Sequence, residues 1–352
     1  MENKKDFVHI KSKELRQFCI KLLKRIKIDD ESSNCIADLL VQANLRGFDS
    51  HGVVRLPTYL KRFSSIKWET PRLMKDNGAT GLMDGNNCMG QVCAARAMNL
   101  AIDKAEKYGI GVIGVRNSNH FGTAASYSMM AAEKRMIGFT FSNASPRLPP
   151  WGGIEPLLGN NPWSFAFPSD KGFPVVLDIS NSVVAAGKIR EALLKGELIP
   201  EGWAMDRNGN VTRNPEDALN GLLLPIGGHK GYGITLVVDI LSGILTGSGC
   251  ANQIRGIEDT NNSQKIGHLL GAIKIDNFIP IKEFLNRMDE LIDLIKDSKR
   301  AQGVTEIFMP GEIEYQTSLE RSRSGIPIPR KVLDKLNDLA EVLEEKKLRT
   351  RV

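Results

Sequence analysis

The segment YGIGVIGVRNSNHFG (108–122) constrains the fold more than any other, because an apolar run leads directly into a polar turn with one histidine. Its β-branched residues favour a strand, and RNSN favours a turn. The residues that follow, TAASYSMMAAEKR, favour a helix with Thr123 as its capping residue. His120 is therefore expected between a strand and a helix start, where free N–H groups favour negative charge and a neutral imidazole. That position suits a catalytic acid or base.

The same segment contains the pattern GxGxxG at Gly109, Gly111 and Gly114. In a dinucleotide-binding loop a strand precedes the first glycine and a helix opens across the last one. Here the alanine-rich residues 93–108 predict a helix before the glycines, and the glycines interrupt the strand that follows. The reversed order argues against a Rossmann phosphate loop.

The composition indicates an ordinary globular protein with one large or two smaller domains, since 41% of the 352 residues are apolar and 25% are charged. No apolar run approaches the roughly 20 residues of a membrane helix, and the first residues lack a signal-peptide core. The five cysteines are scattered and never form CxxC, which fits reduced thiols. We therefore expect a cytoplasmic protein without membrane contact.

Three other classes of function are weighed against an enzyme that uses a dinucleotide. The net charge of +6 comes from dispersed lysines and arginines, so nucleic-acid binding is not expected. The five histidines show no HxxxH or HxH spacing, which argues against a metal-dependent hydrolase and predicts no metal ligands. A binding scaffold without catalysis stays open.

Strands and helices alternate without a strict βαβ rhythm or an internal repeat, which predicts an α/β or α+β fold with helices at both chain ends. Residues 64–80 are irregular and suggest a boundary. The proline- and glycine-rich residues 146–170 predict a long functional loop. The polar residues MPGEIE (309–314) predict a turn, and His268 is expected to be structural.

Two further segments carry polar residues in positions typical of a site. In RGFDSHGVVRLPTYLKR, His51 and Arg55 lie in a short turn behind an amphipathic helix. A helix cap and a solvent-exposed arginine explain that turn equally well. In LLLPIGGHKGYG, His229 and Lys230 lie in a glycine loop before an apolar helix, where Lys230 is either a phosphate or carboxylate contact or a surface lysine.

Reduction of a 2-keto acid by a nicotinamide cofactor requires three kinds of group from the protein. An acid protonates the forming alkoxide, a cation holds the carboxylate, and backbone donors hold the cofactor phosphates. His120 or His51 can be the acid, and Arg55 can grip a carboxylate with two hydrogen bonds. The glycine loops at 152–162 and 227–233 can provide the backbone donors.

Eight blocks of sequence together resemble one known family. They are RGFDSHGVVRLPTYLKR, DGNNCMGQ, GVRNSNHFGTAASYS, PPWGGIEPLLGNNPWSFAFP, VLDISNS, AAGKIREAL, IGGHKGYG and MPGEIE. In this order they are similar to the malate/L-lactate dehydrogenase-like family, the type 2 malate/lactate dehydrogenases, which also contains sulfolactate and ureidoglycolate dehydrogenases and imine reductases. The likeness covers residues 11–329.

The resemblance implies a non-Rossmann NAD(P)-binding fold, a homodimer, and a cleft between a helical domain (1–75 plus 281–352) and a mixed-sheet domain (76–280). It places the acid/base histidine at His120, the carboxylate-binding arginine at Arg55 and a second proton donor at His51. The cofactor positions that it implies are Ala144, Asp178, Ile179, Ser180, His229, Lys230, Pro310, Gly311 and Glu312. At Ala144 some members carry a hydroxyl residue, so here only backbone contact is expected.

The expected reaction is hydride transfer between NAD, or alternatively NADP, and the C2 carbonyl of a small 2-keto acid. Malate and oxaloacetate are the first expectation for the substrate pair. L-lactate, sulfolactate, ureidoglycolate and imine substrates are the alternatives that the same family offers.

Overall fold

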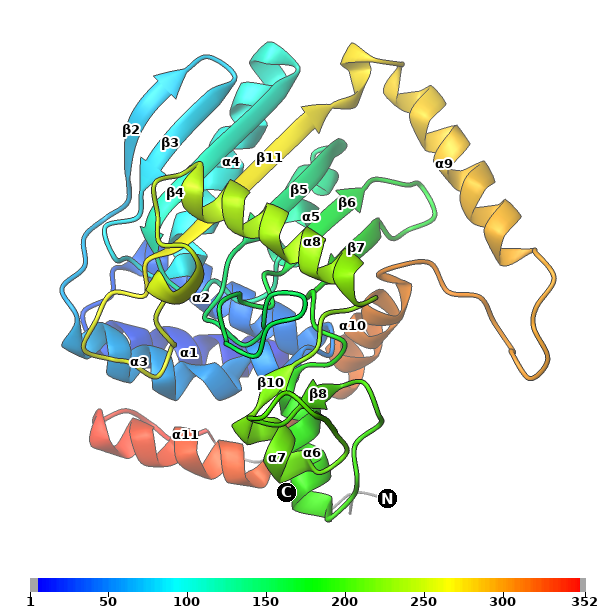
Figure 1. Cartoon of the computed structure of the whole chain (residues 1–352). Coiled ribbons are helices and arrows are strands. Elements are labelled where there is room, and N and C mark those ends of the chain that lie inside the picture. The colour runs from blue at the N-terminus through cyan, green and yellow to red at the C-terminus, as the bar shows by residue number, and fades with distance from the viewer. Residues whose placement is uncertain (1–5, 349–352) are drawn as a thin grey trace.

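The computed structural model describes residues 6–348, and its centre is a seven-stranded sheet of order β2-β3-β4-β11-β5-β6-β7 (Figure 1). The β3–β4 pair is parallel and the other neighbouring pairs are antiparallel. This mixed sheet among helices confirms the predicted α/β class. The strands are β2 (Arg72–Asn77), β3 (Thr80–Asp84), β4 (Ile110–Ser118), β5 (Met136–Ser142), β6 (Trp163–Phe167), β7 (Val175–Ile179) and β11 (Ile266–Lys274).

Helices cover both faces of the sheet because side chains alternate along each strand. On β4, a Cβ atom at Gly111 would meet the backbone of Ala101, whereas one at Gly114 would meet the side chain of Thr246. Helices α4 (Gly90–Tyr108) and α5 (Ala125–Glu133) therefore pack on one face. Helix α8 (His229–Asp239), continued by a π-helical turn at Ile240–Ile244, covers the other.

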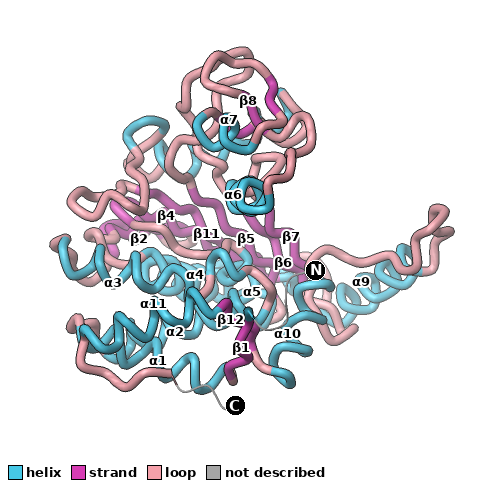
Figure 2. Tube along the Cα trace, turned by 90° about the horizontal axis from the view of Figure 1, so that it is seen from below, coloured by secondary structure: helices cyan, strands magenta, loops and turns pink. Residues whose placement is uncertain are grey.

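A second helical layer lies beneath α4 and α5 and shares one hydrophobic core with them (Figure 2). Near the ends of the chain, β1 pairs with β12 in an antiparallel ribbon, so the two ends of the described chain meet in this layer. The elements of this layer are β1 (Phe7–Ile10), α1 (Ser12–Arg25), α2 (Asp30–Leu45), α3 (Leu56–Ser65), β12 (Ile326–Pro329) and α11 (Arg330–Val342).

A small lobe is inserted between β7 and α8, and it lies on the other side of the sheet from the helical layer (Figure 2). It has a hydrophobic core of its own, which includes Ile189, Ile199 and Ala204. The lobe consists of α6 (Ala186–Lys195), β8 (Ala204–Met205), β9 (Val211–Thr212), α7 (Pro215–Asn220) and β10 (Leu222–Leu223).

Helix α9 (Ile281–Lys296) leaves the body of the molecule, and the chain returns through a loop to α10 (Glu312–Ser324) (Figure 1). The ribbon views show α9 projecting from the side of β7 (Figures 1 and 2). Leu294 is exposed on this helix, while Leu285 and Ile292 are buried.

The structure differs from the sequence expectations at four places. Strand β6 lies inside the segment 146–170 that was expected to be one long loop, because the prolines on either side of WSFAF masked its alternating pattern. Strand β2 lies in the segment expected to be irregular, because RLMKDN is an exposed edge strand without apolar alternation. Helix α10 begins at Glu312 inside the expected turn, because its polar sequence has no apolar stripe to signal a helix. Thr123 does not cap α5, since its hydroxyl contacts Ser126 Oγ at 2.7 Å instead. Within residues 6–348 no helix combines the length and apolar composition that crossing a membrane requires.

Candidate functional site

His120 follows β4 closely, since that strand ends at Ser118. It therefore lies at the end of the sheet that contains the carboxyl end of β4. Its backbone N–H donates to Gln264 Oε1 at 3.0 Å, which ties the turn to the loop before β11. The imidazole is half-buried, so one part of it faces the protein and another faces solvent. The strand end predicted for this histidine is therefore present, and its ring lies where a small substrate can reach it.

Tyr59 on α3 contacts the imidazole from the protein side, with its hydroxyl 2.7 Å from His120 Nδ1. Only 1% of Tyr59 is exposed, and this burial raises the pKa of its hydroxyl, which therefore stays protonated. A protonated hydroxyl can donate to Nδ1 or accept from Nδ1–H, so this contact holds the ring in either tautomer. Nε2 is then the ring nitrogen left for another partner.

His51 stacks on His120 with 5.6 Å between the ring centroids and 19° between the planes. Burial, and then the charge of Arg55, lower the pKa of His51 to about 4. Burial, followed by His51, Arg55 and His268, holds the pKa of His120 well below its usual range. Both rings are therefore neutral at neutral pH. A neutral His120 was expected from the free N–H groups at a helix start. In the structure, burial and neighbouring charge are what lower its pKa.

Arg55 ends the second of two short 3₁₀ turns, Asp49–His51 and Val53–Arg55, which place it beside the histidines. Its Nε–H donates to the carbonyl oxygen of Ser50 at 2.8 Å, and Ser50 Oγ lies 2.9 Å from His51 Nδ1. Arg55 forms no ion pair with a carboxylate of residues 6–348. The guanidinium therefore retains donors for an external carboxylate next to His120.

A buried arginine holds the turn that carries His120. Arg62 is 0% exposed, and its Nε–H donates to Asn119 Oδ1 at 3.0 Å. The same guanidinium donates to the carbonyl oxygens of Asp259 and Asn262. Asn119 in turn donates to the carbonyl oxygens of Asn87 and Cys88. This network fixes the backbone directly before His120.

His268 has the structural role expected for it. It is fully buried on β11, between Ser142 Oγ at 2.9 Å from Nδ1 and Ser118 Oγ at 2.8 Å from Nε2. Its ring stacks on Phe121 with a centroid distance of 4.6 Å. Burial lowers the pKa of His268 to about 3, so the ring is neutral and braces the strands beneath the turn that carries His120.

The cofactor positions implied by the resemblance lie at the same end of the sheet as His120, where β4, β5 and β7 end, and beside β7. Ala144 follows β5, and its N–H donates to Asn161 Oδ1 at 2.9 Å. Asp178 and Ile179 end β7, with Ser180 after them. His229 and Lys230 form the first turn of α8. Pro310 to Glu312 open α10 against β7, where Val176 N–H donates to the Pro310 carbonyl oxygen at 2.9 Å.

These positions differ in whether they have free hydrogen-bonding groups for a phosphate or a ribose. Helix α8 begins after Gly228, which has no capping side chain, so its first N–H groups are free to bind an anion near Lys230. The side chain of Glu312 is instead occupied, because it binds Lys296 and accepts from Met309 N–H. Among residues 6–348 no group of three or more histidine, cysteine or acidic side chains could hold a metal ion.

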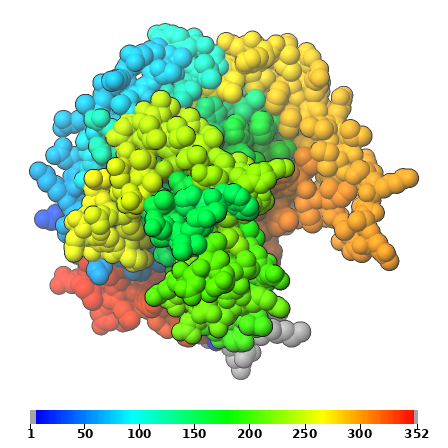
Figure 3. All heavy atoms as spheres, in the orientation of Figure 1, coloured from blue at the N-terminus to red at the C-terminus, as the bar shows by residue number. Residues whose placement is uncertain are grey.

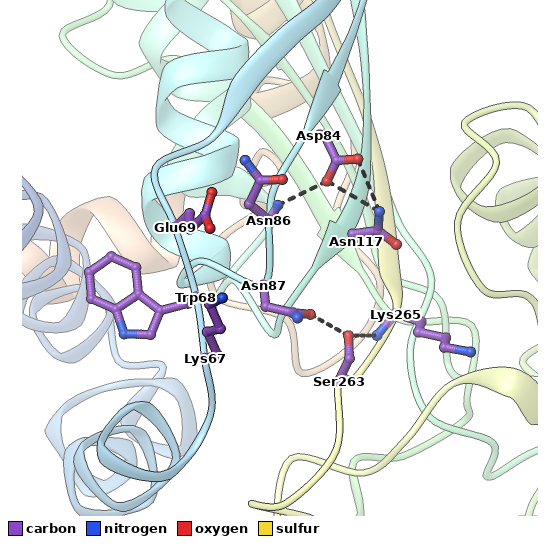
Figure 4. A pocket seen from close by; sticks show the side chains of 9 residues that line it. All are labelled: Lys67, Trp68, Glu69, Asp84, Asn86, Asn87, Asn117, Ser263 and Lys265. Atoms are coloured by element: carbon purple, nitrogen blue, oxygen red, sulfur yellow. Dashed lines mark hydrogen bonds between the residues drawn. The ribbon is translucent and has the colours of Figure 1, made fainter.

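A separate cavity of about 530 Å³ lies at the ends of β3 and β4 and contains none of the expected catalytic residues (Figure 4). Asp84 is its buried carboxylate, and it accepts from Asn117 Nδ2 and Asn86 N–H. Figure 4 shows the Trp68 ring directed away from this carboxylate. Asp84 is thus paired with groups of the protein itself, which include Arg116. These pairs explain the buried carboxylate as a structural feature of the fold.

Tyr59, Arg62, Asn119 and Gln264 belong to the site, although the sequence did not single them out. Tyr59 had a usable signal, since it follows Arg55, the residue directly before α3, by four positions, a spacing that places two residues on one side of a helix. Arg62 and Gln264 had none, because their partners lie far away in the chain.

Comparison with known proteins places these features in a family. A family model described as malate/L-lactate dehydrogenase matches residues 10–337. Malate dehydrogenase from Pyrococcus abyssi is 42% identical over 346 residues, which span 95% of this chain and 95% of that protein. L-sulfolactate dehydrogenase from Methanocaldococcus jannaschii is 38% identical over 337 residues, 95% of this chain and 97% of that protein.

Solved structures agree with the sequence comparisons. The sulfolactate dehydrogenase structure from Methanocaldococcus jannaschii has a TM-score of 0.91 at 37% identity, and covers 97% of this chain and 98% of that chain. The malate dehydrogenase structure from Pyrococcus horikoshii OT3 has a TM-score of 0.90 at 37% identity, and covers 98% of both chains.

Proposed function

The chain belongs to the malate/L-lactate dehydrogenase family, and we propose that it transfers a hydride between a nicotinamide dinucleotide and the C2 carbonyl of a small 2-keto acid. The observation that carries this proposal is that two histidines and one arginine lie together at the end of β4. His120 and His51 stack there, and the charge of Arg55 lowers the pKa of both rings. A proton donor and a carboxylate-binding cation are thus available to the same substrate.

When bound, the dinucleotide supplies the hydride and the protein handles the substrate and the proton. Arg55 binds the carboxylate and so orients the carbonyl. His120, protonated on both ring nitrogens, delivers the Nε2 proton to the carbonyl oxygen and becomes the neutral imidazole, while the Tyr59 hydroxyl stays in contact with Nδ1. The negative charge of the substrate raises the pKa of His120 from its depressed value, so that the imidazole can take up and deliver the proton. His51 orients the His120 ring by stacking.

We propose malate and oxaloacetate as the substrate pair. Relatives named malate dehydrogenase that are 42% and 40% identical to this chain support this choice. A relative named malate/(S)-sulfolactate dehydrogenase is 38% identical, which keeps sulfolactate as the second candidate. NAD is the proposed cofactor, with NADP as the alternative. For its binding we propose Ala144, the residues 178–180, His229, Lys230 and the residues 310–312.

Two substitutions test the catalytic assignment. We expect His120→Ala to reduce kcat by about 100-fold or more, because general acid catalysis contributes 10²–10⁴-fold. Arg55→Ala should chiefly raise the KM for the keto acid, because it removes the carboxylate clamp. Oxaloacetate, pyruvate and sulfopyruvate are assayed with NADH and NADPH. Near-normal kinetics of both variants with all three acids would contradict the assignment, and a wild-type protein that binds NADH without turnover would indicate a binding scaffold.

We also propose that the enzyme is a homodimer, and the outer face of α8 supports this. Val237, Ile240 and Ile244 recur at helical spacing and are exposed, and Leu245 extends the apolar stripe. Figure 3 shows this segment, in yellow-green, on the front surface of the molecule. An apolar stripe of this kind on a single chain marks an interaction surface.

Two broader expectations also stay proposals. One is the division into a helical domain (1–75 plus 281–352) and a cofactor-binding sheet domain (76–280). The other is a cytoplasmic location, which scattered cysteines without CxxC spacing support.

A further inference from the structure

Arg46 is a cation at the end of α2 that no acceptor in the described chain satisfies. Helix α2 ends there because Gly47 takes a φ of +86°, and the turn that follows carries His51. The Nε of Arg46 is buried and has no hydrogen-bond partner within residues 6–348. The residue as a whole is half-buried, so part of its side chain still faces solvent. A buried donor without an acceptor is costly, which points to an external partner.

Two carboxylates lie close enough to this guanidinium for their charges to act on its pKa, but neither forms an ion pair with it in the described part of the chain. Asp178 ends β7, and Glu314 lies in the first turn of α10. Burial lowers the pKa of Arg46, and the charges of Glu314 and Asp178 oppose that shift. Burial also raises the pKa of Asp178 to about 6. No ion pair joins Arg46 to a carboxylate in the described part of the chain, although α2 packs against α10.

We propose that Arg46 binds a phosphate group of the nicotinamide dinucleotide, an assignment that rests on the dehydrogenase function proposed above. A guanidinium suits this ligand because its planar donors match two phosphate oxygens. The position is also suitable, since the proposed cofactor residues Asp178 and Glu312 lie on β7 and α10, the same two elements whose carboxylates act on the pKa of Arg46.

The surrounding charges define the rest of this subsite. Asp178 and Glu314 can accept hydrogen bonds from ribose hydroxyls next to the phosphate, as acidic residues do in other dinucleotide sites. Arg46 also lies on the segment that leads into the turn with His51. Cofactor binding at Arg46 therefore brings the dinucleotide to the segment that carries the catalytic groups.

The competing explanation is that Arg46 only offsets the charges of Asp178 and Glu314. The two explanations differ in what they predict for an altered cation. A countercharge needs positive charge alone, so Arg46→Lys would leave dinucleotide binding unchanged. A phosphate ligand needs the planar fork, so Arg46→Lys would weaken binding and Arg46→Gln would weaken it further.

The experiment measures the Kd of NADH and NADPH by nucleotide fluorescence, without substrate, for the wild type, Arg46→Gln, Arg46→Lys and the control Arg72→Gln. Arg72 is exposed on β2, at the opposite sheet edge from β7. We expect the Kd to rise about 10- to 100-fold for Arg46→Gln, the range of a lost charged hydrogen bond. Arg46→Lys should lie between that value and the wild type, and Arg72→Gln should match the wild type.

Each outcome decides the proposal. Equal weakening of NADH and NADPH supports contact with the pyrophosphate, and weakening of NADPH alone supports contact with its 2′-phosphate. Unchanged Kd values for both dinucleotides in Arg46→Lys overturn the proposal, even where Arg46→Gln fails to fold. A wild-type protein that binds neither dinucleotide overturns the dehydrogenase function as well, so the two failures are distinguishable.

Discussion

At the scale of single residues, the reactivity of His120 depends on groups that hold each of its atoms in a defined state. The Tyr59 hydroxyl occupies Nδ1, His51 covers the ring, and Gln264 holds the backbone N–H. The amide of Gln91 lies next to the Tyr59 hydroxyl and acts against burial on the pKa of Tyr59. These contacts hold the ring from the protein side and leave Nε2 for the proton transfer that we propose.

Replacing Tyr59 by phenylalanine tests this arrangement. We expect kcat to fall about 10- to 100-fold, because the orientation of His120 loses its support. The KM for the keto acid should change little, since Arg55 still binds the carboxylate. Steady-state kinetics across pH 6–9 measure both constants. Tyr108→Phe, at the exposed end of α4, is the control, and equal kcat values in the two variants would contradict the role of Tyr59.

His268 makes the stability of the fold depend on pH. Its pKa is about 3 in the folded state, below the ordinary 6.5, so between these values the unfolded chain binds the extra proton. The stabilisation is complete above pH 6.5 and is lost as pH falls, by about 1.4 kcal/mol per pH unit for one proton. His51 and His120 act in the same direction.

We expect His268→Gln to unfold with a shallower pH dependence than the wild type, by about one proton between pH 4 and 6. Urea unfolding at pH 4, 5 and 6 measures the slope of the free energy of unfolding against pH. Asp178 acts with the opposite sign, because its raised pKa favours the folded state below pH 6, and it is unchanged in both proteins. Identical slopes for the two proteins would show that His268 is not the titrating group.

At the scale of elements, helices approach the sheet closely because glycines on the strands leave room for helix backbone. A Cβ at Gly111 would lie 1.9 Å from the Ala101 carbonyl oxygen of α4, and one at Gly138 would lie 2.1 Å from that of Ser128 on α5. On the other face, a Cβ at Gly267 would lie 1.8 Å from the Ser242 carbonyl oxygen. The GxGxxG pattern therefore contributes a packing glycine to helix–sheet contact.

Gly111→Ala is expected to lower the free energy of unfolding by about 3 kcal/mol, because α4 must move away from β4 to admit the methyl group. Gly187→Ala is the matched control, since it lies within α6 with no atom within 4 Å of the new Cβ. That control should be stabilised by about 0.5–1 kcal/mol. Denaturant unfolding compares the three proteins, and equal stability of both variants would refute close α4–β4 packing.

At the scale of the whole molecule, one end of the sheet brings together groups from distant parts of the chain. The outer face of α8 is exposed and offers a surface for association. Val237 is 53% exposed and Ile244 is 62% exposed on the segment that covers the sheet. Burying such side chains stabilises an interface by about 25 cal/mol per Å² of apolar surface. The projecting helix α9 adds a second candidate surface (Figure 2).

The double variant Val237→Asp with Ile244→Asp should be a monomer at concentrations where the wild type is a dimer, because the interface would then bury unpaired charges. Sedimentation velocity measures the mass of each protein. Met74→Asp, on the exposed edge strand β2, is the control and should remain dimeric. A monomeric wild type, or a dimeric double variant, would exclude an interface on this stripe.

Much of the fold was predictable because its elements carry strong local signals. The alanine-rich helix before β4, the apolar strand β4 and the apolar helix α8 each follow from periodicity and turn residues. The polar helix α10 and the exposed strand β2 were missed because neither has such periodicity. The family and the mixed α/β class are confirmed, while the roles of the catalytic and cofactor residues stay predictions.

The sequence by itself determined the family, the kinds of chemical group available, and the strand end on which His120 lies. Tertiary structure decided which groups meet. The contact of Tyr59 with His120, the clamp of Arg62 on Asn119 and the place of Arg46 beside Asp178 join positions far apart in the chain. Local periodicity cannot encode such pairs, because they depend on how the sheet edge and the helical layer pack. The same packing removes water from the imidazoles and so sets their pKa values.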